Sequence, residues 1–137
     1  MKRVWIGLAA IVLAGCGSAA TEPTAPTTTT RPAATTNPYP LPAYDYVETR
    51  DGYISAFVNK QLTDDELSRI FYNLKSWYTT QDKEGGWFVQ INCGTPDGPR
   101  LANGKFALDN LGAAQTGLAG AGAGEFAPLD TRQPCNA

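Results

Sequence analysis

The stretch that decides the fold is Thr63-Asp-Asp-Glu-Leu-Ser-Arg-Ile-Phe-Tyr-Asn-Leu-Lys-Ser-Trp-Tyr78. Apolar side chains recur in it at spacings of three and four, the period of one face of an α-helix. Thr63 and Glu66 have the spacing of a capping box, and Leu62 and Leu67 that of a hydrophobic staple across it. We therefore expect an amphipathic helix over residues 64–80, with its apolar stripe in the core.

Segments rich in β-forming residues lie on both sides of this helix. Residues 53–58 precede it and residues 87–93 follow it, and a strand, a helix and a strand in series favour a right-handed βαβ crossover. Residues 44–49 are the expected hairpin partner of the first strand, because Asp51-Gly52 is a favoured two-residue turn. These segments predict a mixed sheet.

The C-terminal part adds weaker signals. Residues 101–108 are an expected strand with a candidate bulge at Asn103-Gly104, and residues 125–127 are an expected short edge strand. The sequence of residues 109–118 does not decide between a helix and a strand. The glycine-rich run over residues 117–124 is typical of a flexible loop. The predicted fold class is α+β, with one main amphipathic helix packed on a small mixed β-sheet.

The N-terminus carries an export signal. Lys2 and Arg3 precede an apolar run over residues 4–13, whose length of about 15 Å as a helix is half that of a hydrocarbon core and suits a cleaved signal peptide. The run ends in Leu13-Ala14-Gly15-Cys16, which resembles the lipobox of bacterial lipoproteins. The resemblance implies lipidation of Cys16 and cleavage before it. The alternative is an ordinary secretory signal followed by a free or paired cysteine.

These features divide the chain into three parts. Residues 1–15 are the expected signal peptide. Residues 16–42 are the lipidated cysteine and a disordered stalk, because residues 17–42 contain eight Thr and six Pro and almost no apolar side chain to bury. Residues 43–137 are the expected globular domain, held on the extracytoplasmic face of the cell membrane by the lipid anchor.

Two cysteines remain in the expected domain, Cys93 and Cys135. Export places them in an oxidising compartment, and their number is even once Cys16 is lipidated. We therefore expect a disulfide between them. The alternative is a reactive thiol pair, which their distance in sequence and the absence of a Cys-x-x-Cys spacing disfavour.

Composition excludes several classes of function. The chain has no histidine, which removes Ser/His and Cys/His catalysis in their usual form and the commonest ligand of zinc sites. We expect no metal and no cofactor. The net charge is −2 and the basic residues are scattered, so nucleic acid is not an expected partner.

Two acidic clusters are the candidates for paired-carboxylate chemistry of the kind that hydrolyses glycans. The first contains Asp45, Glu48 and Asp51 beside the expected hairpin turn, where solvated charges are ordinary. The second, residues 64–66, is explained by capping of the helix. No residue is therefore assigned as catalytic.

A candidate binding patch arises if residues 87–93 pair with residues 101–108. The pairing would gather a basic, amide and aromatic set able to bind an anionic or glycan ligand. Its members are Trp87, Gln90, Arg100, Asn103 and Lys105. A solvated sheet face is the alternative.

Three segments carry a wider resemblance: Gly86-Trp-Phe-Val-Gln-Ile-Asn-Cys93, Arg100-Leu-Ala-Asn-Gly-Lys-Phe-Ala107 and Gly112-Ala-Ala-Gln-Thr-Gly-Leu118. With the lipobox and stalk they resemble small lipoproteins of mycobacteria and related actinobacteria, and of their phages. The resemblance carries no catalytic residues across. A phage origin would add one hypothesis, because some prophages display small lipoproteins that block entry of further phage DNA.

We therefore expect a lipid-anchored, non-enzymatic binding module of the cell envelope. Its expected partner is an envelope or phage protein or a cell-wall glycan. The alternatives are a prophage-type superinfection-exclusion lipoprotein, a small carboxylate-dependent cell-wall glycan hydrolase, and a purely structural surface protein.

Overall fold

The structure is a computed structural model, and it describes residues 29–31 and 39–135. Cys16, the expected signal peptide and most of the expected stalk lie outside the described residues. The elements are β1 (Thr29–Arg31), β2 (Tyr44–Arg50), β3 (Tyr53–Val58), α1 (Asp64–Thr80), β4 (Gly86–Cys93), β5 (Arg100–Ala107), α2 (Asn110–Thr116) and β6 (Gly124–Pro128).

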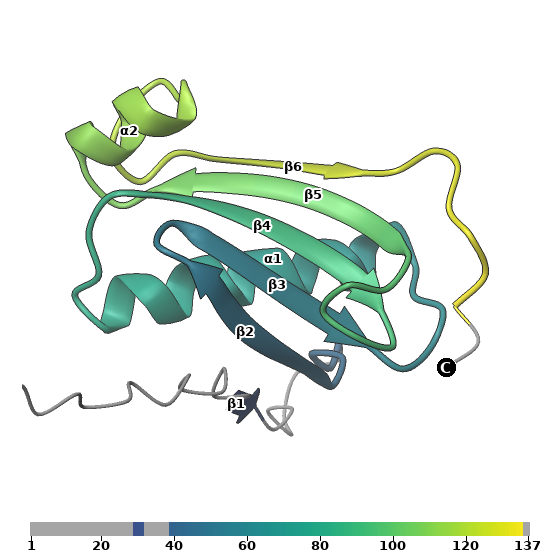
Figure 1. Cartoon of the computed structure of the whole chain (residues 1–137). Coiled ribbons are helices and arrows are strands. Elements are labelled where there is room, and N and C mark those ends of the chain that lie inside the picture. Colours follow the sequence, from purple (N-terminus) through teal and green to yellow (C-terminus); the bar gives the residue numbers. More distant parts are fainter. Residues whose placement is uncertain (1–28, 32–38, 136–137) are drawn as a thin grey trace, which may run out of the picture.

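The strands form one mixed sheet in the order β1-β2-β3-β4-β5-β6 (Figure 1). All neighbours are antiparallel except β3 and β4, which run parallel because α1 connects them. The β2–β3 hairpin turns at Asp51 and Gly52 as predicted, and Gly52 has a φ of +77°, which glycine adopts without strain. The α+β class and the β-α-β unit are confirmed.

The helix α1 has the predicted bounds, and its capping box is formed. The backbone N–H of Glu66 donates to Thr63 Oγ1 at 3.3 Å, and the backbone N–H of Thr63 donates to Glu66 Oε2 at 2.8 Å. The second bond holds the pKa of Glu66 below its usual value, because it stabilises the ionised carboxylate. The side chains that α1 buries are Leu67, Ile70, Phe71, Leu74 and Tyr78.

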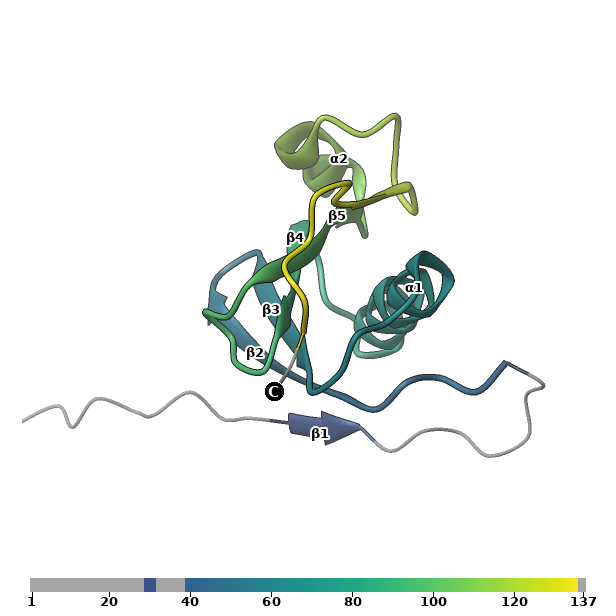
Figure 2. The same ribbon diagram turned by 90° about the vertical axis from the view of Figure 1, so that its right-hand side faces the viewer.

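One face of the sheet packs against α1, and we call it the covered face (Figure 2). Its aromatic rings form a cluster that includes Tyr78 against Trp87, with ring centroids 4.5 Å apart, and Phe71 against Phe106 at 6.1 Å. Phe71 and Phe106 are fully buried. Burial of this surface is the main source of stability.

The second helix, α2, occupies the segment whose state the sequence left open. Asp109 caps it, because Oδ1 accepts from the backbone N–H of Gly112 at 2.6 Å. The other carboxylate oxygen accepts from the backbone N–H of Gly85 at 2.7 Å, so Asp109 also ties α2 to the start of β4. These backbone bonds lower the pKa of Asp109.

The expected bulge at Asn103-Gly104 is wrong. Both residues pair in regular register with β4, and the irregularity lies between the pairs Ile91↔Ala102 and Asn92↔Arg100, which leaves Leu101 as the extra residue. Gly104 has another reason to be glycine: a Cβ there would lie 2.5 Å from the Phe71 ring.

The predicted disulfide is confirmed, with the Cα atoms of Cys93 and Cys135 5.4 Å apart. It joins the end of β4 to the C-terminal segment. At one edge of the sheet, β1 falls within the expected stalk and pairs with β2. Pro42 is buried and Leu41 packs against the core, so packed chain extends before residue 43.

Candidate binding face

The face of the sheet that points away from α1 carries the polar side chains of the central strands, and we call it the open face. Side chains alternate along a strand, so the register places Tyr53, Ser55, Phe88, Gln90, Asn92, Arg100, Asn103 and Lys105 on it.

Two segments bound the open face at its ends. The loop over residues 94–99 crosses one end, where the Ser55 hydroxyl donates to the Pro96 carbonyl oxygen at 2.7 Å and the Asn92 amide donates to the same oxygen. At the other end lies α2, whose Thr116 carbonyl oxygen accepts from Lys105 Nζ at 2.9 Å. The middle of the face, between loop and helix, is left without a covering element among the described residues.

Arg100 organises the amides of this face. Its guanidinium donates to three amide oxygens: Nε to Asn92 Oδ1 at 2.7 Å, Nη1 to Asn103 Oδ1 at 2.6 Å and Nη2 to Gln90 Oε1 at 2.5 Å. Burial lowers the pKa of Arg100, which still stays protonated at neutral pH. We call these four residues the arginine network.

The network fixes which way each amide points. Because a guanidinium is a donor only, the three amides turn their oxygens towards it and their NH₂ groups away. The Asn92 NH₂ group donates to Ser55 Oγ at 2.9 Å and to Pro96. The NH₂ groups of Gln90 and Asn103 donate to no other group of the described chain, so both remain available to a ligand.

Two aromatic side chains lie beside the network. The rings of Tyr53 and Phe88 are stacked, with centroids 5.1 Å apart and planes inclined by 22°. The guanidinium of Arg50 lies 3.8 Å from the Tyr53 ring centroid, a cation–π contact. Both rings are partly exposed.

The stack and the amides line a shallow hollow of about 320 Å³, which we call the amide hollow. Its walls come from four adjacent strands, β3 to β6. Lys105 also lines the hollow, where its Nζ forms an ion pair with Glu125 Oε2 at 3.0 Å. The side chains that define the hollow are Tyr53, Phe88, Gln90, Asn103, Lys105 and Glu125.

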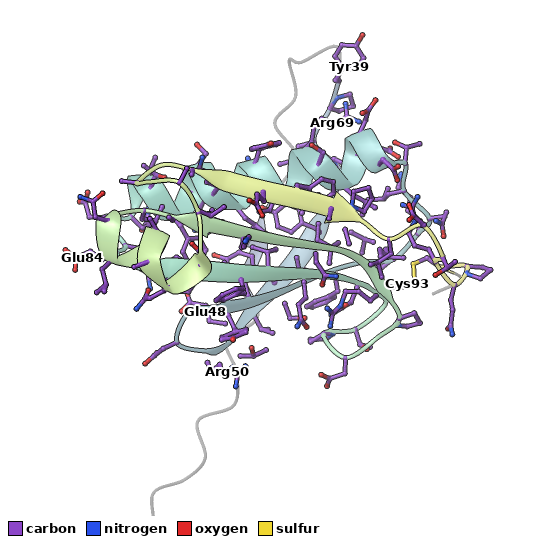
Figure 3. The ribbon with its side chains drawn as sticks, turned by 90° about the horizontal axis from the view of Figure 1, so that it is seen from above. Tyr39, Glu48, Arg50, Arg69, Glu84 and Cys93 are labelled. Atoms are coloured by element: carbon purple, nitrogen blue, oxygen red, sulfur yellow. A yellow bond between two sulfur atoms is a disulfide. The ribbon has the colours of Figure 1, made fainter. Side chains whose placement is uncertain are left out.

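A second hollow of about 500 Å³ adjoins it and shares Tyr53 and Phe88. We call it the acidic hollow, because Glu48, Asp51 and Glu84 line it together with Lys83. Figure 3 shows Glu48 and Glu84 towards one end of the molecule and Cys93 towards the other. The acidic hollow therefore lies at the end away from the disulfide.

The structure brings four of the five patch residues together: Gln90, Arg100, Asn103 and Lys105 share the open face. The fifth, Trp87, is not on this face. It is 6 % exposed on the covered face, where its indole N–H donates to the Glu84 carbonyl oxygen at 3.0 Å. Residues 87 and 90 are three apart on one strand, and side-chain alternation sends them to opposite faces.

Sequence reasoning also missed the aromatic members of the site. Phe88 lies two residues before Gln90 on β4, so side-chain alternation alone would have placed it beside Gln90. Tyr53 reaches the site through the parallel pairing of β3 with β4, which sets it opposite Phe88. That register depends on the fold, and no local pattern encodes it.

The structure divides the first acidic cluster: Glu48 and Asp51 both line the acidic hollow, and Asp45 does not. Asp45 and Glu48 lie on opposite faces of β2, because they are three residues apart on one strand. Glu48 accepts from the Tyr78 hydroxyl at 2.7 Å and lies 3.5 Å from Lys83 Nζ. Burial raises the pKa of Tyr78, and the bond to Glu48 raises it further.

In the second acidic cluster, Asp64 pairs with Arg132 at 2.6 Å and Glu66 caps α1. Within residues 29–31 and 39–135, no three cysteine, aspartate or glutamate side chains are placed to hold a metal ion together. None of the described helices combines the length and apolar character needed to cross a membrane.

Comparison of the chain with protein-family models, curated proteins and solved structures finds no match.

Proposed function

We propose that this protein is a lipid-anchored envelope protein whose open face binds a ligand without catalysing its conversion. The observation that carries the proposal is the arginine network, which aims two free amide donors into a hollow beside a stacked aromatic pair. A few oriented polar groups next to aromatic surface are the usual make-up of a ligand site.

Preorganisation supports a binding role over a merely solvated face. A solvated surface needs no fixed orientation of its amides, whereas here Gln90 and Asn103 are held by hydrogen bonds shorter than 2.7 Å to one guanidinium. Orienting these groups costs free energy during folding, so less side-chain entropy is lost when a ligand binds. Charge-assisted bonds of this kind are also stronger than bonds between neutral groups.

The lipid anchor is the second part of the proposal and rests on the Leu-Ala-Gly-Cys16 motif. Anchoring would raise the concentration of the open face near envelope ligands without any new contact. The test is the distribution of the chain between detergent and aqueous phases, with its intact mass. Wild type should carry acyl chains and enter detergent, and Cys16→Ala should do neither. Wild-type protein without added acyl mass would contradict the anchor.

Binding itself is tested by sedimentation of the full chain with isolated cell envelope. Arg100→Met keeps much of the side-chain length but removes the donors that orient the amides, so the bound fraction should fall. Lys60→Met is the matched control, because it removes one positive charge from an exposed residue outside both hollows. Equal binding by Arg100→Met and wild type would contradict the proposal.

The acidic hollow supports one competing proposal, hydrolysis of cell-wall glycan by carboxylates. Its carboxylates Glu48, Asp51 and Glu84 are all exposed residues, whereas a general acid is normally kept protonated by burial. Release of soluble sugar from isolated cell wall decides between the two. Release by wild type that disappears in Asp51→Asn would replace the binding proposal with an enzymatic one.

A further inference from the structure

We propose that the amide hollow binds an anionic, N-acylated pyranose unit of an envelope glycan. The sugar ring lies against Phe88, and carboxylate or acyl oxygens accept hydrogen bonds from Gln90 and Asn103. This assignment rests on the proposed function and adds the chemical class of the ligand.

The position of the hollow excludes recognition by strand addition. The hollow lies on the face of the sheet over β4 and β5, and each of these strands is paired on both sides. The edge strand β6 borders the hollow with the side chains of Glu125 and Ala127, and its free backbone edge points away from the hollow, along the sheet. An extended peptide that joins a sheet needs a free edge, with unpaired N–H and C=O groups. A ligand in this hollow must therefore be recognised by side chains.

The aromatic wall favours a ring with an apolar face. Phe88 and its partner Tyr53 present partly exposed π surface, which carries negative potential and attracts the C–H groups on one face of a pyranose. The volume of about 320 Å³ is at the small end of ligand sites, which suits one or two sugar rings. Polar groups of the next strands then lie beside the rim of the ring, where a sugar carries its substituents.

The polar wall favours oxygen acceptors. The free groups of Gln90 and Asn103 are NH₂ donors, and their oxygens are polarised by Arg100, which strengthens them as donors. An N-acyl carbonyl oxygen or a carboxylate matches such donors, and a protonated amine, which can only donate, does not.

The charges around the amide hollow favour an anionic ligand. Lys105 is already paired with Glu125, so these two charges offset each other. Arg100 binds only amide oxygens, and no carboxylate neutralises it among the described residues. The network therefore leaves a positive charge behind the two free donors, which a ligand carboxylate would offset.

The test uses full-length lipidated protein in detergent micelles and calorimetric titration with three disaccharides. The first is N-acetylglucosaminyl-N-acetylmuramic acid, the second is the same sugar with its carboxylate reduced to an alcohol, and the third is cellobiose. The first should bind, reduction should weaken binding about tenfold or more because a charge-assisted bond is lost, and cellobiose should bind weakest. Equal affinity for all three would overturn the assignment.

Two variants and one control test whether the disaccharide binds in the amide hollow. Asn103→Asp keeps the oxygen that Arg100 binds but replaces the free NH₂ donor with an acceptor, so the domain stays folded and affinity falls about tenfold or more. Phe88→Leu keeps apolar bulk but removes the ring and should weaken binding several-fold. Asn59→Asp makes the same chemical change outside the hollow and should bind as wild type. An Asn103→Asp variant that binds the disaccharide as wild type does would also overturn the assignment.

Envelope sedimentation separates this inference from the proposed function. If Asn103→Asp loses envelope binding while none of the disaccharides binds wild type, the glycan assignment is wrong and the open face still binds another ligand. If Arg100→Met and Asn103→Asp both bind envelope as wild type does, the proposed function and the glycan assignment are both wrong.

Discussion

The two faces of the sheet differ although the same strands build both. The covered face is apolar and fully packed, with Ile91, Ala102 and Phe106 at 0 % exposure. The open face carries an arginine network and a partly exposed aromatic stack. Alternation along each strand lets one set of residues make the core and the next set make the site. Stability and ligand binding should therefore respond to different residues of the same strands.

The largest effect should come from removing an aromatic ring of the covered face. Phe106→Ala deletes a fully buried ring that packs against Phe71 and Tyr78, and should lower the free energy of unfolding by about 3–5 kcal/mol. Phe88→Ala on the open face should cost about 1 kcal/mol and weaken binding. Urea unfolding followed by tryptophan fluorescence measures both. If both variants lost the same free energy of unfolding, stability would not depend more on the covered face than on the open face.

The disulfide should have the next largest effect. It closes a loop of 42 residues, and its removal in Cys93→Ala/Cys135→Ala should cost about 2–4 kcal/mol. Cys93 lies on the covered face, so envelope binding by the folded variant should not change. Alkylation offers a second check, because both thiols should react only after reduction. Native protein in which Cys93 and Cys135 are alkylated without reductant would contradict the bridge.

Gly104 tests how tightly the covered face is packed. A Cβ at this position would lie 2.5 Å from the Phe71 ring, so Gly104→Ala should lower the free energy of unfolding by about 1–3 kcal/mol. At Gly120 a Cβ meets no atom within 4 Å, and Gly120→Ala should change stability by less than about 0.5 kcal/mol. Thermal unfolding of the two variants compares them. A harmless Gly104→Ala would mean that Phe71 moves aside easily.

The smallest expected effect concerns the attachment of α2, which bounds the open face. The backbone N–H groups of Gly112 and Gly85 lower the pKa of Asp109 in the folded state. A lowered folded pKa means that this stabilisation is present above the unfolded pKa and is lost as pH falls through the folded value.

At about pH 6, Asp109→Asn should therefore have a lower melting temperature than wild type. This difference in melting temperature should shrink at about pH 2. Asp130→Asn makes the same chemical change at an exposed carboxylate outside the helices, so it is the control and should show no such narrowing. A difference between wild type and Asp109→Asn that is independent of pH would contradict the electrostatic origin of this cap.

Local signals allowed much of the fold to be predicted. The capping box and apolar period of α1, the Asp51-Gly52 turn and the β-rich segments on both sides depend on residues within a few positions of one another. The disulfide followed from the even number of cysteines left in the expected domain once the N-terminus was interpreted as an export signal. The sequence itself also determined the alternation that puts Phe88 beside Gln90 and turns Trp87 away from both, which the predicted patch did not take into account.

Only the tertiary structure decided that Arg100 belongs to the site. By alternation alone, Arg100 would face away from Asn103 and Lys105, because it is an odd number of residues from each. The extra residue Leu101 shifts the register of β5 against β4, so that Arg100 faces Asn92 on the open face. A bulge places two residues of one strand opposite one residue of its partner, so it exists only in the paired strands. It is therefore not encoded in residues 100–107 alone.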